Sequence, residues 1–222
     1  MRVNYGAFDK VYRRLRAEGS DWNTPEQLGE TVSLISKFFD RAEVPRSGRV
    51  LELGCGAGDL SLWLAGQGFE VFGVDISPTA INWAREKFSA RRLSGNFRVA
   101  SVLDLAEFDE GFFDIVLDGH CFHCIIGDDR RLFLSNVYRV LRPRGIFHVA
   151  TMCGEIHDPE VRAAFDPVTR CIMRDGMAIR QIETDVHILH EIESAGFRIL
   201  HWEIDPPTTL QDQGDILVNA TR

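Results

Sequence analysis

VLELGCGAGDLSLWL, residues 50–64, is the stretch that decides the fold. It opens with a short apolar run broken only by Glu52, followed by glycines at every second position, Gly54, Gly56 and Gly58. An apolar, helix-like segment begins after the last glycine. A buried strand, a glycine-rich turn and a helix N-terminus together form the phosphate or nucleoside site of a parallel sheet. The stretch therefore predicts a nucleotide-type ligand beyond the end of a first strand.

The chain alternates strands and helices after this stretch. We predict strands at 49–53, 70–74, 96–100, 113–117 and 146–151, and helices at 59–67, 78–90 and 129–141. Two amphipathic helices, 5–18 and 25–42, come before the first strand. This alternation predicts an α/β fold of three layers, with a doubly wound, mostly parallel sheet between helices.

The last third of the chain departs from that pattern. Residues 153–181 hold two short, partly apolar arms around Asp175-Gly176, which predicts a β-hairpin or flap. A helix at 184–195 and strands at 197–204 and 215–220 follow, the last strand being antiparallel. We expect a single domain over 1–222: a helical cap (1–45), a cofactor-binding core (46–152), an insert or flap (153–183) and a C-terminal helix with a strand pair (184–222).

Composition narrows the class of protein. The 45% hydrophobic content suits one domain with a substantial core. We find no apolar run of the roughly 18 residues that span a bilayer and no signal-peptide pattern, so we expect a cytoplasmic protein without membrane contacts. The net charge of −8 disfavours non-specific nucleic-acid binding. Five cysteines, an odd number, indicate reduced thiols.

Two common nucleotide motifs do not match. A dinucleotide fingerprint, G-x-G-x-x-G, would need a third glycine where Asp59 stands. A P-loop would need Gly-Lys-Ser/Thr, which does not follow. Instead, Glu52 and the three glycines resemble motif I, E/D-x-G-x-G-x-G, of the class I S-adenosylmethionine-dependent methyltransferases, small-molecule type. The likeness continues through VFGVDISPTAI, VASVLDL, FFDIVLDGHCFHCI and VYRVLRPRGIFHVA.

The resemblance implies a seven-stranded, Rossmann-like methyltransferase sheet that binds S-adenosyl-L-methionine and releases S-adenosyl-L-homocysteine. It implies that Asp75 binds the ribose hydroxyls and Asp104 the adenine amino group, roles that suit carboxylate acceptors. Each residue also has a purely structural explanation, such as packing for Gly58 or a turn for Asp104. The cofactor contacts that we expect come from Glu52, Gly54, Cys55, Gly56, Gly58, Asp75, Ile76, Asp104, Leu105, Gly119, Tyr5 and Trp22.

The segment DGHCFHC, 118–124, has three interpretations. In the family, residues at this point face the transferred methyl group, and a histidine can act there as a general base near pH 7. We expect His120 in that role, with Asp118 second and His123 third, although His123 aligns with a histidine that is often structural. Cys121 and Cys124 form C-x-x-C, but a metal site would need further donors. Cys153, His148 and Cys171 are conceivable ones, and we predict no metal.

We expect the segments that cover the site to recognise the methyl acceptor. These are the N-terminal helices, with Tyr5, Tyr12 and Trp22, and the insert 153–182. Aromatic rings near a sulfonium contribute cation–π attraction. DWNTP resembles a segment of thiopurine and thiol methyltransferases, and the Asn-Pro-Pro-Tyr type motif of amino-methylating nucleic-acid enzymes is absent. We therefore predict transfer to an O, S or N atom of a small molecule, by a monomer or homodimer. The alternatives are a protein or RNA methyltransferase with a partner subunit, and a cofactor-binding protein without transfer activity.

Overall fold

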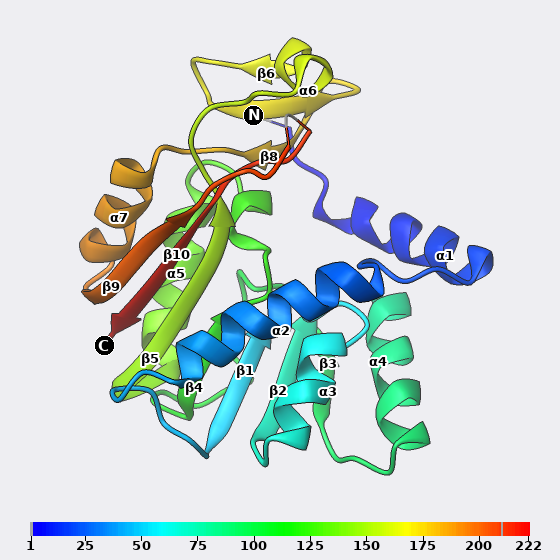
Figure 1. Cartoon of the computed structure of the whole chain (residues 1–222), viewed down its shortest axis with the longest axis vertical. Helices are drawn as coiled ribbons and strands as arrows, with labels where there is room; N and C mark the ends of the chain where they lie inside the picture. Colours follow the sequence, from blue (N-terminus) through cyan, green and yellow to red (C-terminus); the bar gives the residue numbers. More distant parts are fainter. Residues whose placement is uncertain (1, 210) are drawn as a thin grey trace.

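The computed structural model describes residues 2–209 and 211–222, and its centre is a seven-stranded sheet (Figure 1). The strand order is β3-β2-β1-β4-β5-β10-β9. β10 is antiparallel to β5 and β9, whereas the pairs among β1 to β5 are parallel. The strands are β1 (Arg49–Leu53), β2 (Glu70–Asp75), β3 (Asn96–Val99), β4 (Phe113–Asp118), β5 (Leu141–Met152), β9 (Arg198–Asp205) and β10 (Asp215–Thr221). The predicted fold class is confirmed.

Helices cover both faces of this sheet (Figure 1). α2 (Pro25–Phe39), α3 (Asp59–Gly66) and α4 (Pro78–Ala90) share one core with Val50 and Ile115. α5 (Asp129–Val140) and α7 (Asp185–Ser194) share the other core with Leu51 and Val116. Successive strand residues thus bury both faces, which explains why these strands read as continuous apolar runs. Within the described residues, no helix has the length and apolarity needed to cross a membrane.

Local signals explain why the helix starts could be predicted. Thr24 and Gln27 form a reciprocal capping box before α2, with Pro25 at its first position. The Ser77 side chain accepts from the Ala80 amide at the start of α4. The main departure is β5, which pairs from Leu141 onward instead of from 146, with an irregularity between its first two register pairs. The strand was predicted to begin only at 146 because Arg142-Pro143-Arg144-Gly145 resembles a loop.

The segment between β5 and α7 forms a small antiparallel sheet, drawn above the main sheet in Figure 1. The predicted hairpin is confirmed: β7 (Cys171–Arg174) and β8 (Met177–Gln181) flank Asp175 and Gly176, both with positive φ. The sequence did not predict β6 (Phe165–Asp166) or α6 (Pro159–Ala163). At the N-terminus, Val3 bridges to Ala178 before η1 (Tyr5–Ala7) and α1 (Phe8–Glu18).

Candidate active site

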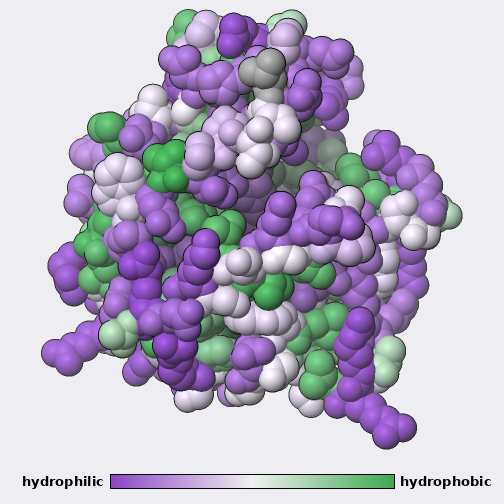
Figure 2. All heavy atoms as spheres, viewed as in Figure 1, coloured by the Kyte–Doolittle hydropathy of each residue, from purple (hydrophilic) through white to green (hydrophobic). Residues whose placement is uncertain are grey.

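The carboxyl ends of β1, β2 and β4 open into a cavity of about 620 Å³. The space-filling view shows a hollow between the small sheet and the helices α1 and α2 (Figure 2). The cavity has two ends. The cofactor half comprises the loop after β1 and the ends of β2, β3 and β4, under Tyr12 and Trp22. The acceptor half lies between α2 and the β5–β10 pair, and is lined by Gln27, Glu30, Thr31, Leu34, Ile35, His148, Ala150, Asp205, Thr208, Asp215 and Leu217.

Two glycines of the loop after β1 are needed for close approach. Gly54 and Gly56 have positive φ, 67° and 52°. A Cβ would lie 2.6 Å from Cβ of Cys121 at Gly54, and 2.5 Å from the Tyr12 hydroxyl at Gly56. Both glycines line the cavity, as does Cys55. Gly58 does not: it faces Ala84 of α4, which fits the packing explanation.

Two buried carboxylates, Asp75 and Glu52, line the cofactor half. Asp75 accepts from the Gly56 amide at 2.9 Å and from the Ser77 amide at 2.8 Å, and burial raises its pKa. Glu52 accepts from the Ser61 hydroxyl, and burial raises its pKa to about 8. Both line the cavity beside Ile76. Each Asp75 oxygen keeps a second lone pair, so the carboxylate can still accept from ligand hydroxyls.

The residues of the cavity lining after β3 differ from the predicted adenine contacts, Asp104 and Leu105. Ser101, Val102 and Leu103 line the cavity. The Asp104 amide donates to the Ser101 carbonyl, so the chain turns, and the exposed Asp104 carboxylate accepts from the Ala106 amide instead. Leu105 is fully buried away from the cavity. The adenine-contact prediction for Asp104 and Leu105 does not fit this geometry. Sequence reasoning missed Ser101, although it lies only two residues beyond the strand end.

Asp118, at the end of β4, carries an unsatisfied oxygen. Its Oδ1 accepts from the amides of Cys121 and Phe122, each at 3.0 Å. Its Oδ2 is buried and has no hydrogen-bond partner among the described residues. Burial raises the pKa of Asp118 to about 7. Asp118 and Gly119 both line the cavity, so this carboxylate is positioned to receive a ligand cation or N–H.

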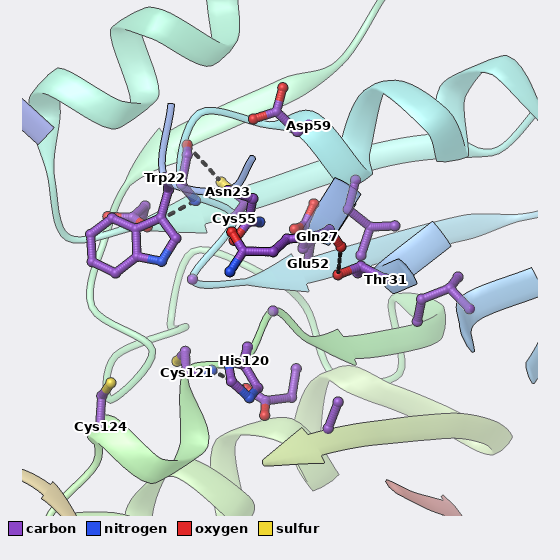
Figure 3. Close-up of a pocket in the computed structure, with 18 of the residues that line it drawn as sticks. Trp22, Asn23, Gln27, Thr31, Glu52, Cys55, Asp59, His120, Cys121 and Cys124 are labelled. Atoms are coloured by element: carbon purple, nitrogen blue, oxygen red, sulfur yellow. Dashed lines mark hydrogen bonds between the residues drawn. The ribbon is translucent and has the colours of Figure 1, made fainter. Parts of the chain in front are cut away.

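His120 pairs with a residue that the sequence did not reveal. Its Nε2 lies 3.1 Å from both oxygens of Asp215, at the start of β10. Burial lowers the pKa of His120, but the hydrogen bond and charge of Asp215 outweigh this effect, and the net shift is upward. His120 adopts φ 61°, an uncommon conformation for a non-glycine residue. Figure 3 shows it across the cavity from Gln27 and Thr31.

His123 lies outside the cavity lining. It sits in η2 (Phe122–Cys124), is 2% exposed and packs edge-on against His120 with ring centroids 4.5 Å apart. Burial lowers its pKa well below the usual value, so it is neutral. This geometry supports the structural interpretation of His123, and not the catalytic one.

The N-terminal helices cover the cofactor half. Tyr5, Tyr12 and Trp22 line the cavity, and the rings of Tyr12 and Trp22 lie 5.1 Å apart. The Tyr5 hydroxyl donates to Asp129 at 2.8 Å, which holds η1 in place. The Asp9 carboxylate accepts from the Ser77 hydroxyl at 2.8 Å and ties α1 to α4.

The insert lies beside the cavity and contributes no residue to its lining. No residue between 154 and 183, all of them described, lines the cavity. The insert packs Cys171 and Ala178 against Ile126, Val3 and Tyr5, and Tyr5 itself lines the cavity. Asp205 and Thr208, from the end of β9 and the loop after it, also line the cavity.

The cysteines of the cavity are neutral thiols. Burial raises the pKa values of Cys55 and Cys121, and raises that of Cys124 to about 12. Across residues 2–209 and 211–222, no group of three or more His, Cys, Asp or Glu side chains is placed to hold a metal ion. The C-x-x-C pair thus lacks the further donors that the metal alternative required.

The charge of the lining tests the fit to S-adenosylmethionine, which carries a sulfonium and an ammonium. The described lining contains no Lys or Arg. It contains seven carboxylates: Glu30, Glu52, Asp59, Asp75, Asp118, Asp205 and Asp215. A cationic ligand without phosphate fits these residues, and the free Asp118 Oδ2 offers its ammonium a buried partner.

Comparison with known proteins supports S-adenosylmethionine as the ligand of this site. The family model described as a methyltransferase domain matches residues 51–149, which run from β1 into β5. This part of the chain is a methyltransferase domain of the class I S-adenosylmethionine-dependent type. The match covers the cofactor half and ends before β9 and β10.

Two relatives and one solved structure show how far the likeness extends. The Bacillus subtilis protein YqeM is 36% identical over 107 residues, 47% of this chain and 42% of that protein, so the chain spans less than half of YqeM. The Mycobacteroides abscessus 2-heptyl-1-hydroxyquinolin-4(1H)-one methyltransferase is 27% identical over 69% of this chain and 67% of that protein. A structure concerned with conversion of a disulfide bond into a thioacetal group during echinomycin biosynthesis is 28% identical, with a TM-score of 0.70 over 99% of this chain and 93% of that one.

Proposed function

We propose that this methyltransferase transfers a methyl group from S-adenosylmethionine to an O, S or N atom of a small molecule. The observation that carries the proposal is the continuity of the cavity. One space joins Glu52, Asp75 and Asp118 to the His120–Asp215 pair and to the chamber under α2. A donor in the cofactor half and an acceptor in the acceptor half therefore share one chamber.

The size of the chamber and the relatives support a small acceptor. About 620 Å³ has to hold both the cofactor and the acceptor, and small-molecule sites have typical volumes of about 300–1,000 Å³. The M. abscessus relative acts on a hydroxyquinolone, as its name states. The structure related to echinomycin biosynthesis aligns over nearly the whole chain.

The residues of this chain have separate tasks in the transfer. When bound, the cofactor supplies an electrophilic methyl group on a sulfonium. Glu52, Asp75 and Asp118 bind the polar groups of the cofactor. The rings of Tyr12 and Trp22 cover the cofactor half and exclude water from it. Holding donor and acceptor in line accounts for most of the rate enhancement in such a displacement.

His120 acts as the general base that removes the proton of the methyl acceptor. Its Nε2–H donates to Asp215, so the neutral ring has its lone pair on Nδ1. Nδ1 takes the proton that an acceptor hydroxyl, thiol or neutral amine gives up as its lone pair forms the new bond to carbon and the sulfonium leaves as a thioether. Asp215 fixes this tautomer and stabilises the imidazolium that results, without contacting the acceptor.

A two-step experiment tests the proposal. Calorimetry should show binding of S-adenosylhomocysteine, and a panel of phenols, thiols and amines, incubated with S-adenosylmethionine, should give products heavier by one methylene unit. No binding of either cofactor form at millimolar concentration would disprove the proposal. Tight cofactor binding without turnover across the panel would favour the cofactor-binding alternative.

A further inference from the structure

The floor of the acceptor half is a column of residues on β5 and β10. Leu217 stands opposite Ala150, and Asn219 stands opposite His148. Asp215, Leu217 and Asn219 are alternate residues of one strand, so their side chains share one face of the sheet. His120 holds one end of this column through Asp215, and His148 lies at the other end. His148 lines the cavity but has no task in the transfer described above.

His148 is fixed in one orientation and one protonation state. It is 3% exposed, and the Phe38 ring of α2 packs against it with centroids 4.5 Å apart. Its Nδ1 lies 2.7 Å from Oδ1 of Asn219. An amide oxygen only accepts, so Nδ1 carries the hydrogen and Nε2 keeps the lone pair. Burial lowers the pKa of His148 to about 4, and the ring is therefore neutral.

The other nitrogen of this ring has nothing to bond to. His148 Nε2 is buried without a hydrogen-bond partner among the described residues. The two nitrogens of an imidazole ring point in widely different directions. Because Nδ1 points to Asn219 of β10, Nε2 points away from β10. A buried acceptor left unsatisfied costs about 1–3 kcal/mol, and such groups are rare in folded proteins. Leu34 and Ile35 of α2 line the same space and offer Nε2 no donor group on their side chains.

We propose that His148 Nε2 accepts a hydrogen bond from the far end of the methyl acceptor. The acceptor is then a molecule with two polar ends, a nucleophile at His120 and an O–H or N–H donor at His148, and an apolar part over Leu217 and Ala150. The proposal rests on the proposed function and names its substrate class.

Strand geometry sets the length of that molecule. Asp215 and Asn219 are four residues apart on β10, which corresponds to about 13–14 Å between their Cα atoms. His120 contacts Asp215 at one end, His148 contacts Asn219 at the other, and Leu217 and Ala150 form an apolar floor between them. Two fused rings with a polar group at each end fit this span.

Three naphthalene probes test the proposal in the presence of saturating S-adenosylhomocysteine. Naphthalene-2,6-diol has a donor at both ends, 6-methoxy-2-naphthol keeps the shape but loses one donor, and 2-naphthol lacks the second polar group. The wild-type complex should bind the diol about tenfold more tightly than the methoxy compound, one hydrogen bond's worth of affinity. His148→Phe should reduce that ratio to about one, and His148→Gln, which keeps an acceptor, should restore part of it.

A matched control is His201→Phe, because His201 stands opposite Asn219 on β9 and does not line the cavity. It should leave the ratio unchanged. A ratio near one in the wild type, a ratio that survives His148→Phe, or no binding of any probe at millimolar concentration would each overturn the proposal. S-adenosylhomocysteine affinity is measured first, because it distinguishes failure of the His148 proposal from failure of the proposed function. If the wild type does not bind S-adenosylhomocysteine, the proposed function itself is rejected.

Discussion

The two halves of the cavity differ in the polar side chains that line them. In the cofactor half, Glu52, Asp75 and Asp118 are buried carboxylates whose pKa values are raised, and Asp118 keeps a free oxygen. In the acceptor half, two histidines are held by neighbours on β10, and most of the space between them is apolar. The cofactor half thus presents buried carboxylates to a positively charged ligand, whereas the acceptor half combines the two histidines with the carboxylates Glu30, Asp205 and Asp215 around an apolar floor. Substitutions in one half should leave the other intact.

The largest expected effect comes from the base. His120→Gln removes the group that takes the proton, and should lower the rate about 10²- to 10⁴-fold. Cofactor affinity should stay unchanged, because His120 belongs to the acceptor half. Steady-state kinetics and calorimetry with S-adenosylhomocysteine measure the two quantities. A similar loss in both would show that the halves are not independent.

The next effect concerns the cofactor half. Asp75→Ala deletes an acceptor for two ligand hydroxyls and should weaken cofactor binding about 100-fold, since each hydrogen bond to a charged group contributes about 1.5–3 kcal/mol. Asp104→Ala is the matched control, because that carboxylate is exposed and accepts only from the Ala106 amide. Calorimetry should detect no change in this control. Equal losses in the two variants would restore the adenine role that the sequence suggested for Asp104.

A smaller effect follows from the partner of the base. The Asp215 carboxylate raises the pKa of His120, and only the neutral ring accepts a proton, so kcat/KM should rise with pH through a value above 6.5. Asp215→Asn removes the charge that stabilises the imidazolium. The inflection should then move down by about one pH unit, and the rate should fall about tenfold. A pH–rate profile with an unmoved inflection would assign the titration to another group, such as Asp118.

The smallest effect is on stability without cofactor. The folded-state pKa of Glu52, about 8, exceeds its unfolded value, so the folded protein binds more protons and loses stability as pH rises from about 4.5 through 8. Glu52→Gln removes this loss and should raise the melting temperature at pH 8 by a few degrees. Calorimetric melting at pH 6 and pH 8 measures it. Glu30→Gln, on the exposed side of α2, should change neither value; a lower melting temperature for Glu52→Gln would contradict the assignment.

The same contrast decides what the sequence could reveal. Most of the cofactor half comes from one short segment, Glu52 to Ile76, where a strand, glycines and a carboxylate occur at fixed spacing. The acceptor half combines α2 with residues near 120, 148 and 215, and His120 lies 95 residues from Asp215. No local pattern marks Asp215, because its role depends on the register of β10 against β5. Asp104 lies outside the cavity lining because the chain turns after β3, and spacing alone does not show this turn.

The reversed strand β10 has a consequence for synthesis. It follows β9 in sequence yet lies between β5 and β9, so β9 cannot join the sheet until β10 has been made. Asp215 reaches His120 only at that moment. A nascent chain that has released residues 51–149 already has the segments of the cofactor half from β1 to β4, but neither the partner of its base nor the floor of its acceptor chamber. The proposed base therefore gains its partner, and the acceptor half its floor, only after β10 has been synthesised.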